Sequence, residues 1–258
     1  EPQNISDVSS AASSEATSTT ASSESTGDAA QELTFVLSNI PDGLDPSVTN
    51  NSFAQYVLIN CFEGLVTYDS TGTLVPGNAE SWDISDDGLT YTFHLRDGLK
   101  WSDGSDLTAE DYVYTIQRVL TPATAAQYVS MATDYIKNAQ EYYDGTATAD
   151  DLGVKALDDK TLEITLIQPT SYFIDILSMW TTVEANGDKW STEADTYICN
   201  GPFKIASMSM NENVILEKNE NYWDAENVSL QKVTFRYVLD QATALTAYES
   251  GEVDGVAS

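Results

Sequence analysis

The chain has 258 residues, with 11 Lys and Arg against 41 Asp and Glu, which gives a formal net charge of −30. This length suffices for one large domain or two smaller ones with a sizeable core. So few cations cannot build a basic patch, which argues against nucleic acid and anionic membrane surfaces as partners, and no apolar run approaches the roughly 20 residues that span a bilayer.

The first 31 residues consist almost entirely of Ser, Thr, Ala, Glu and Gly. Few apolar side chains larger than Ala occur there, so burial cannot offset the entropy cost of ordering. We expect residues 1–31 to form a disordered, weakly acidic tether. The sequence starts with Glu1 and has no charged-then-apolar leader, which predicts a processed or trimmed product.

The first ordered elements are predicted from residue 32 onward. Residues 32–40 (ELTFVLSNI) alternate as a strand does, with Leu33, Phe35 and Leu37 on one face. After a turn-rich loop, residues 52–65 carry apolar side chains at helical spacing, with Gly64 as the stop. The predicted buried side of this helix carries Phe53, Tyr56, Val57, Cys61 and Phe62.

Residues 89–95 alternate as a half-buried strand that places His94 on the more polar face. Two Gly-containing turns follow around Trp101. Thr108 then opens a helix and Asp111 lies in its first turn. The apolar residues of this helix recur every three or four positions and form one stripe: Tyr112, Val113, Ile116, Val119 and Leu120.

The second half of the chain alternates helices and strands. We expect helices over 128–143 and 172–180, two short strands within 152–166, and a strand over 232–238. Residues 241–250 form a helix with Gly251 as its stop, and 252–257 form a new strand. This strand–helix–strand unit predicts a parallel pair. Because a sheet strand ends the sequence, we expect an incomplete fold.

The residues that carry enzyme chemistry are sparse. His94 is the only histidine and lies in mid-strand, so a catalytic triad is not predicted. Residues 83–88 resemble the start of a calcium loop, but the twelfth position is His94 rather than Glu, which favours a hairpin turn. A zinc site from Cys61, Cys199 and His94 lacks close ligand spacing. Carboxylates are so abundant that their number does not exclude the paired acids of a glycosidase, although nothing in the sequence singles out one pair.

Cys61 and Cys199 are the only cysteines. In an exported protein they pair as a disulfide across 138 positions, or they stay as two buried free thiols; the sequence leaves both open. Four aromatic residues are candidates for stacking on a ligand, although aromatic residues at helix and loop positions usually belong to the core: Trp101, Tyr128, Trp180 and Trp223.

Several blocks in a fixed order carry a family resemblance. They include FHLRDGLKWSDG within residues 64–120, and further along DLGVKALDDKTLEITL, NGPFKI, NENVILEKNENYWD and YESGEVDGVA. From about Leu33 to the end, the chain resembles the extracytoplasmic solute-binding proteins of peptide ABC importers, the oligopeptide- and dipeptide-binding family. The resemblance covers the N-terminal half of such a protein.

The resemblance implies a two-lobed receptor that closes on an extended peptide, whose backbone pairs with receptor backbone as in strand addition. The family's ligand-facing positions map onto Asn50, Asn51 and Ser52, after the Asp45–Pro46 turn, and onto Tyr128. A surface helix cap is the alternative interpretation of residues 50–52. The block around Trp101 builds the scaffold beside the groove. No cofactor and no metal site are implied.

The expected fold class is α/β: the mixed-sheet lobe of a two-lobed periplasmic-binding-protein-like fold, with an inserted α+β subdomain and without the second lobe. Residues 32–63 and 188–258 form the incomplete first lobe, and 64–187 form the subdomain.

The predicted function is that of an extracellular or periplasmic receptor, tethered to the outer face of the cytoplasmic membrane by an anchor outside this sequence. It binds peptides as a monomer, delivers them to an ABC permease and catalyses no reaction. As a fragment it is expected to bind weakly or not at all. Alternatives are a nickel chelate, an oligosaccharide or a signalling peptide as ligand, an adaptor without ligand, and a secreted carboxylate-based glycosidase.

Overall fold

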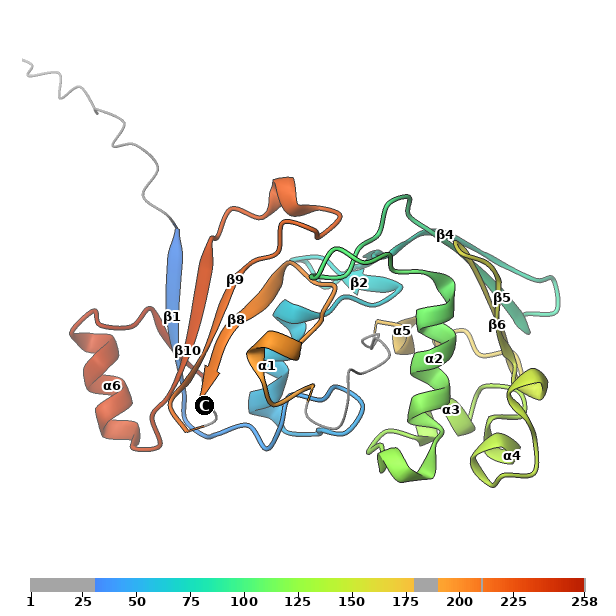
Figure 1. The fold of residues 1–258 in the computed structure, drawn as a ribbon, viewed down its shortest axis with the longest axis horizontal. Coiled ribbons are helices and arrows are strands. Elements are labelled where there is room, and N and C mark those ends of the chain that lie inside the picture. The colour runs from blue at the N-terminus through green and yellow to red at the C-terminus, as the bar shows by residue number, and fades with distance from the viewer. Residues whose placement is uncertain (1–30, 179–189, 210, 258) are drawn as a thin grey trace, which may run out of the picture.

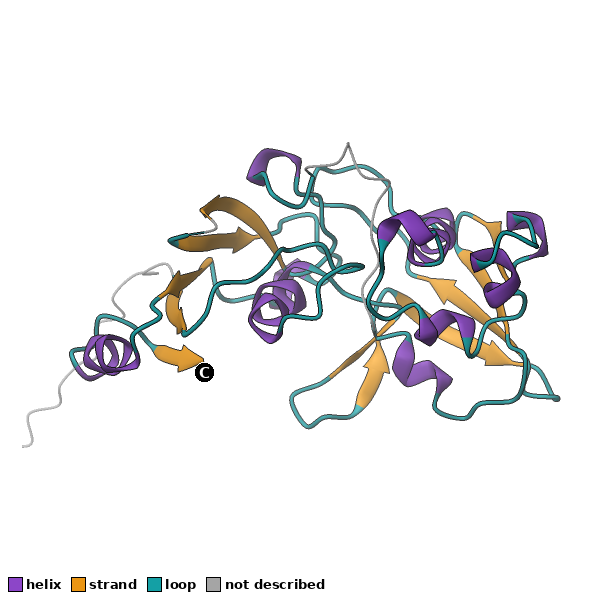
Figure 2. Ribbon diagram, turned by 90° about the horizontal axis from the view of Figure 1, so that it is seen from below, coloured by secondary structure: helices purple, strands orange, loops and turns teal. Residues whose placement is uncertain are grey.

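A computed structural model describes residues 31–178, 190–209 and 211–257. The two larger of three β-sheets in the described residues lie at opposite ends of an elongated molecule, and helices α1 and α2 lie between them (Figure 1). The view from below shows the same separation of the two groups of strands (Figure 2). Most of the predicted tether, residues 1–30, lies outside the described part of the chain.

The first sheet is mixed and has the strand order β11-β1-β10-β9-β8. Strand β1 runs parallel to both of its neighbours, β10 and β11, whereas β10, β9 and β8 are antiparallel. The predicted parallel relation of the last two strands is therefore confirmed, but β1 lies between them. The strand bounds are β1 Glu32–Leu37, β8 Phe203–Ser209, β9 Asn213–Lys218, β10 Lys232–Tyr237 and β11 Gly255–Ala257.

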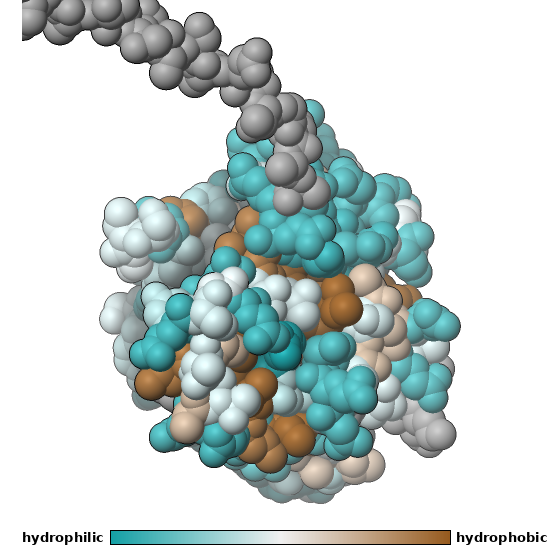
Figure 3. Space-filling model, turned by 90° about the vertical axis from the view of Figure 1, so that its left-hand side faces the viewer, coloured by the Kyte–Doolittle hydropathy of each residue, from teal (hydrophilic) through white to brown (hydrophobic). Residues whose placement is uncertain are grey.

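Both faces of β1 are covered, because successive side chains of a strand point to opposite faces. Val36 packs with Ala244 of helix α6 (Gln241–Glu249), whereas Leu37 belongs to the main core. Helix α1 (Ser52–Cys61) contacts β8 within that main core. Exposed apolar side chains of α6 lie at this end of the molecule, and Figure 3 shows brown areas among polar ones on this face.

The second sheet is antiparallel throughout, with the order β4-β5-β7-β6. Helix α2 (Ala109–Val119) packs on it, mainly against β6. The alternating burial of β5 is the one predicted from the sequence. The bounds of the remaining elements are β2 Val66–Tyr68, β3 Leu74–Pro76, β4 Ala79–Ile84, β5 Thr90–Leu95, β6 Val154–Asp158, β7 Thr161–Thr165, α3 Ser130–Thr133, α4 Ala139–Tyr143 and α5 Phe173–Ile176.

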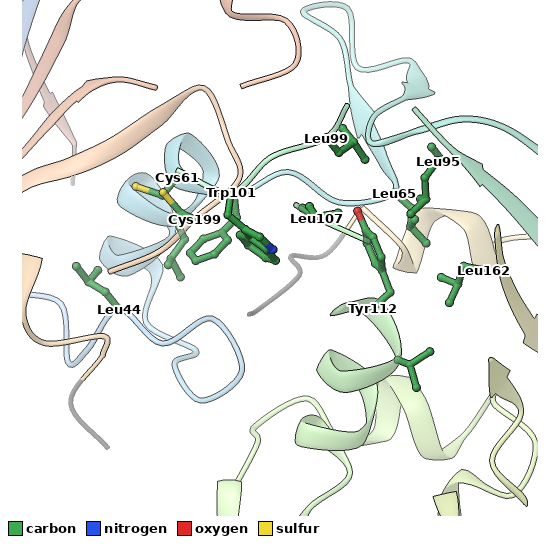
Figure 4. Packing of buried hydrophobic residues seen from close by; sticks show 14 of the residues in the cluster. Leu44, Cys61, Leu65, Leu95, Leu99, Trp101, Leu107, Tyr112, Leu162 and Cys199 are labelled. Carbon is green, nitrogen blue, oxygen red and sulfur yellow. The ribbon is translucent and has the colours of Figure 1, made fainter. Parts of the chain in front are cut away.

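One hydrophobic cluster extends from the first sheet to the second. Trp101 lies buried within it, so this candidate for stacking on a ligand is a core residue. Figure 4 shows Trp101 between the cysteines of one end and Leu107 and Tyr112 of the other. The two sheets are therefore joined by packed side chains as well as by the chain.

Two predicted elements are wrong in detail. Residues 128–143 form two short helices, because Asn138 adopts a left-handed φ of 59° and Ile136 pairs with Leu166 in a β-bridge. On α1, Val57, Cys61 and Phe62 are buried as the apolar spacing predicts, whereas Tyr56 is exposed. Leu58, outside that predicted series, is also buried. None of the helices in the described ranges is long and apolar enough to cross a membrane.

Candidate functional site

The two segments that the family resemblance singles out lie next to each other. The loop at residues 45–52 leads into α1, and the connection between α2 and α3 carries Gln127 and Tyr128. The side-chain amide nitrogen Nδ2 of Asn50 lies 3.5 Å from Oε1 of Gln127, across 77 sequence positions. Both residues are exposed. Sequence reasoning placed these segments separately on a groove, and the fold brings them onto one surface.

A partly buried ion pair fixes the loop against α2. Nη1 of Arg118 donates to Oδ1 of Asp45 at 3.0 Å, and Nη2 donates to Oδ2 at 2.5 Å. The two side chains are only 15% and 16% exposed. Asp45 also accepts a hydrogen bond from the backbone N–H of Ser47. A bidentate pair of this kind orients both groups as well as attracting them, so it sets where the loop runs.

Asn51 is the N-cap of α1. Its Oδ1 accepts from the backbone N–H groups of Phe53 at 2.8 Å and Ala54 at 3.2 Å, which satisfies two of the unpaired donors of the first turn. Thr49 supports the cap, because its Oγ1 accepts from the N–H of Asn51 and donates to Asp42. The cap interpretation therefore holds for Asn51, while Asn50 and Ser52 present exposed side chains beside it.

Tyr128 is 38% exposed and lines an apolar cavity of about 120 Å³. The cavity is bounded by α2, α3, α5 and the second sheet, and Pro46 and Ser47 of the loop also line it. The loop, Tyr128 and the cavity thus form one continuous surface feature.

The two cysteines are buried free thiols, so the disulfide that the sequence left open is not formed. Figure 4 shows the two sulfur atoms side by side. Sγ of Cys199 donates to the carbonyl oxygen of Phe203 at 3.4 Å. Burial, and then the hydrogen bond with Cys199, raise the pKa of the Cys61 thiol well above its usual range. These thiols act as small apolar core residues.

A buried carboxylate, Glu63, lies where α1 leads into the second part of the molecule. Its side chain accepts hydrogen bonds from Tyr222 Oη and, at 3.2 Å, from Trp223 Nε1. Asn78 and Asn200 both donate to its backbone carbonyl. Burial raises the pKa of Glu63, and the two side-chain hydrogen bonds partly oppose that rise. The network ties together segments from both sheets.

The remaining sequence candidates lie away from the loop. Nε2 of His94 lies 2.9 Å from Oδ2 of Asp83 on the neighbouring strand, an ordinary cross-strand contact. Trp223 is half-buried under the guanidinium of Arg96, whose Cζ lies 3.7 Å from the ring centroid. Trp180 lies outside the described residues. Asp87 closes the β4–β5 turn by accepting from Ser85 and Leu89, as the hairpin interpretation predicts.

Sequence reasoning missed Arg118, Gln127 and Glu63. Arg118 carried one available signal, since it is the basic residue in the last turn of a helix in a chain with few cations. Its partner lies 73 positions away, and no local pattern identifies such a pair.

Comparison with known proteins identifies the family. The model of the bacterial extracellular solute-binding proteins, family 5 Middle, matches residues 73–258. The chain belongs to this family. As a family 5 solute-binding protein it is a binding protein by class, and its relatives include receptors named for oligopeptides and dipeptides.

Two curated relatives and one solved structure illustrate the similarity. The oligopeptide-binding protein OppA of Bacillus subtilis is 37% identical over 221 residues, which are 83% of this chain and 40% of that protein. The probable deoxycholate-binding periplasmic protein YgiS of Escherichia coli is 40% identical, over 83% of this chain and 41% of that protein. The crystal structure of the periplasmic oligopeptide-binding protein OppAIV from Borrelia burgdorferi matches with a TM-score of 0.83 and 39% identity.

This family 5 chain spans less than half the length of the relatives it matches. The OppAIV alignment covers 88% of this chain but 47% of the solved one. The mixed α/β fold therefore corresponds to one lobe of a periplasmic binding protein, as the sequence predicts.

Proposed function

We propose that this chain supplies one wall of a receptor that captures peptides in an extended conformation and delivers them to an ABC permease. The contact between Asn50 and Gln127 carries the proposal, because it joins the two candidate ligand segments on one surface. The names of the family 5 relatives support peptides as the ligand class. Pairing of peptide backbone with receptor backbone makes such binding tolerant of sequence.

The ligand site proposed here consists of Asn50, Ser52 and Tyr128, with Asn51 holding the helix end beneath them. Exposed side-chain amides and hydroxyls beside an aromatic ring supply hydrogen bonds and an apolar contact to an extended chain. Gln127 belongs to the same surface. Because the relatives are about twice as long, a second wall comes from a region equivalent to their unmatched half, and the chain alone binds weakly.

The division into parts is also a proposal. Residues 32–63 and 188–258 form the incomplete first lobe, which fits a mixed sheet built from both ends of the described chain. Residues 64–187 form the inserted subdomain around the antiparallel sheet. Residues 1–31 act as a tether that keeps the monomeric receptor at the outer face of the cytoplasmic membrane, where the permease collects the ligand without covalent change.

A second candidate ligand class is the bile acids. One relative at 40% identity is named as probably deoxycholate-binding, and the apolar cavity lies beside the proposed site. The cavity is too small for a whole steroid, since ligand pockets commonly reach roughly 300–1,000 Å³. We therefore place peptides first and keep deoxycholate as an arm of the test.

The test is a titration of the 258-residue chain with tetra-alanine and, separately, with deoxycholate, read by amide NMR to millimolar concentration. We expect saturable binding of tetra-alanine. Asn50→Ala should weaken it about fivefold, equivalent to one net hydrogen bond of about 1 kcal/mol. Asn60→Ala is the matched control, because Asn60 lies at the far end of α1 and donates to Tyr56.

If the chain binds deoxycholate but does not bind tetra-alanine, the ligand class is a steroid rather than a peptide. If the chain hydrolyses a chromogenic glycoside and a single Asp or Glu substitution abolishes that activity, the chain is a glycosidase rather than a receptor. If Asn50→Ala and Asn60→Ala change the affinity for tetra-alanine equally, the binding site does not lie on the loop.

A further inference from the structure

The two thiols of the chain lie against each other in the core. Cys61 is the last residue of α1, and Cys199 lies in the segment that leads into β8. Neither side chain is exposed to solvent. Figure 4 shows the two sulfur atoms side by side, and a hydrogen bond joins the two thiols. The fold thus brings together two oxidisable groups that lie far apart in the sequence.

The backbones that carry the two thiols are also held in place. The backbone N–H of Gly201 donates to the carbonyl oxygen of Cys61 at 2.7 Å. A Cβ atom on Gly201 would lie 2.6 Å from the carbonyl carbon of Cys61, so only glycine permits this approach. The N–H of Cys199 donates to Oγ of Ser102 at 3.1 Å, and the N–H of Ser102 donates to the carbonyl oxygen of Cys199 at 2.8 Å. The two segments are therefore fixed side by side, which is the arrangement that a disulfide requires.

Other uses of two adjacent thiols find no support in the structure. Among the described residues, no group of three or more His, Cys, Asp and Glu side chains could hold a metal ion. Both thiols are too deeply buried to touch a ligand in the folded chain. The family to which the chain belongs is described as extracellular, and disulfides form and persist in oxidising compartments of that kind. Oxidation of the pair is the chemistry that these observations favour.

The place of the pair in the chain determines what a disulfide would do. Residues 61 and 199 flank the whole proposed subdomain, residues 64–187, and are 138 positions apart. A cross-link stabilises the folded state largely by restricting the unfolded chain, and the effect grows with the length of the closed loop. A bond between these residues would join the end of α1 to the segment before β8, at the base of the subdomain.

We propose that Cys61 and Cys199 form a redox-sensitive lock at the base of the subdomain. One cysteine thiolate attacks a disulfide-bearing oxidant such as glutathione disulfide, forms a mixed disulfide with it and releases one thiol of the oxidant. The second thiolate attacks the protein sulfur of the mixed disulfide and releases the other thiol. Two protein thiols are thereby oxidised to one disulfide. The oxidant is reduced to two thiols, which take up the two protons that the cysteines lose. The proposal is independent of the ligand.

Burial controls when the lock changes its redox state. Both side chains are inaccessible in the folded chain, so a reagent reaches them only in molecules that have opened. Burial also raises the pKa of the Cys61 thiol, which lowers the fraction of thiolate available for attack. The folded reduced chain therefore resists oxidation, and the folded oxidised chain resists reduction. The redox state is set while the chain folds and is then retained.

The test is oxidative refolding of the 258-residue chain. The chain is unfolded in urea with a reductant, freed of the reductant, and refolded with glutathione disulfide or with reduced glutathione alone. With glutathione disulfide we expect a monomer that has no free thiol in urea and whose intact mass is lower by two hydrogen atoms. Its folding equilibrium constant, measured by equilibrium unfolding in urea, should exceed that of the reduced chain about a hundredfold.

Cys61→Ala and Cys199→Ala are the controls. Each variant retains a single thiol, so glutathione disulfide should not stabilise either of them. The comparison of the two wild-type products does not depend on these variants and decides the question if either fails to fold. Glutathione disulfide added to the folded, reduced wild type should leave both thiols free over the time in which the refolding chain is fully oxidised.

Three results for the refolded wild type would overturn the inference. They are retention of both free thiols, attachment of two glutathiones, and a disulfide that gives no gain in stability. Fast oxidation of the folded, reduced chain would also overturn it, because burial then would not protect the pair.

Discussion

Removal of Arg118 tests how the candidate site is held. Arg118→Ala removes both charge-assisted hydrogen bonds from Asp45, whose side chain is 16% exposed in the wild type. Breaking a fully buried pair by removing one partner costs about 3–5 kcal/mol, and a hydrogen bond to a charged group is worth about 1.5–3 kcal/mol. Because the pair keeps slight solvent access, we expect a loss of about 2–4 kcal/mol in the free energy of unfolding.

The assay is equilibrium unfolding in urea of the wild type, Arg118→Ala, Asp45→Ala and the double variant. The double-mutant cycle isolates the coupling between the two side chains, which we expect at about 2 kcal/mol. Lys160→Ala is the matched control, because Lys160 pairs with Asp97 with side chains 57% and 90% exposed. Exposed pairs contribute little to stability, because water and salt screen them. A cost for Arg118→Ala no larger than that control, or a coupling near zero, would refute the role given to the ion pair.

Two further predictions concern buried titratable groups. Burial raises the pKa of Glu63 in the folded state above that of an unfolded glutamate, so the folded state binds the proton more tightly. The stability from this group is fully present below the unfolded pKa and is lost as the pH rises through the folded pKa. Glu63→Gln should therefore gain stability relative to the wild type as the pH rises through the folded pKa of Glu63. Glu220→Gln, which changes an exposed carboxylate, is the control. A pH-independent difference between Glu63→Gln and the wild type would contradict the burial of the charge. Because both cysteines are buried and burial raises the pKa of Cys61, a thiol reagent should modify neither in the native protein and both in urea, whereas fast native labelling would contradict the packing.

Local patterns predicted the elements whose burial follows a simple period. The alternation at 90–95 predicted β5, and the three- and four-residue spacing predicted α2. The split of 128–143 depends on a β-bridge from Ile136 to Leu166, a long-range pairing that outweighs helical spacing. The insertion of β1 between β10 and β11 likewise depends on partners about 200 positions away.

The site shows the same division. The loop at 50–52 and Tyr128 came from the resemblance to a family, while their contact through Gln127 and the Asp45–Arg118 pair needed the fold. Asn51 at the N-cap was foreseeable from its residue type before a helix. The raised pKa of Glu63 was not, because burial of a carboxylate depends on side chains from distant segments.

The central claim is that an extended peptide lies across the loop and the segment around Tyr128. Tetra-alanine with a nitroxide at its amino terminus, added to the 258-residue chain, measures this directly by broadening nearby amide resonances. We predict broadening centred on Asn50, Ser52, Gln127 and Tyr128, with the β4–β5 turn at residues 85–88 unaffected. Broadening centred on that turn, or spread evenly over the surface, would contradict the claim.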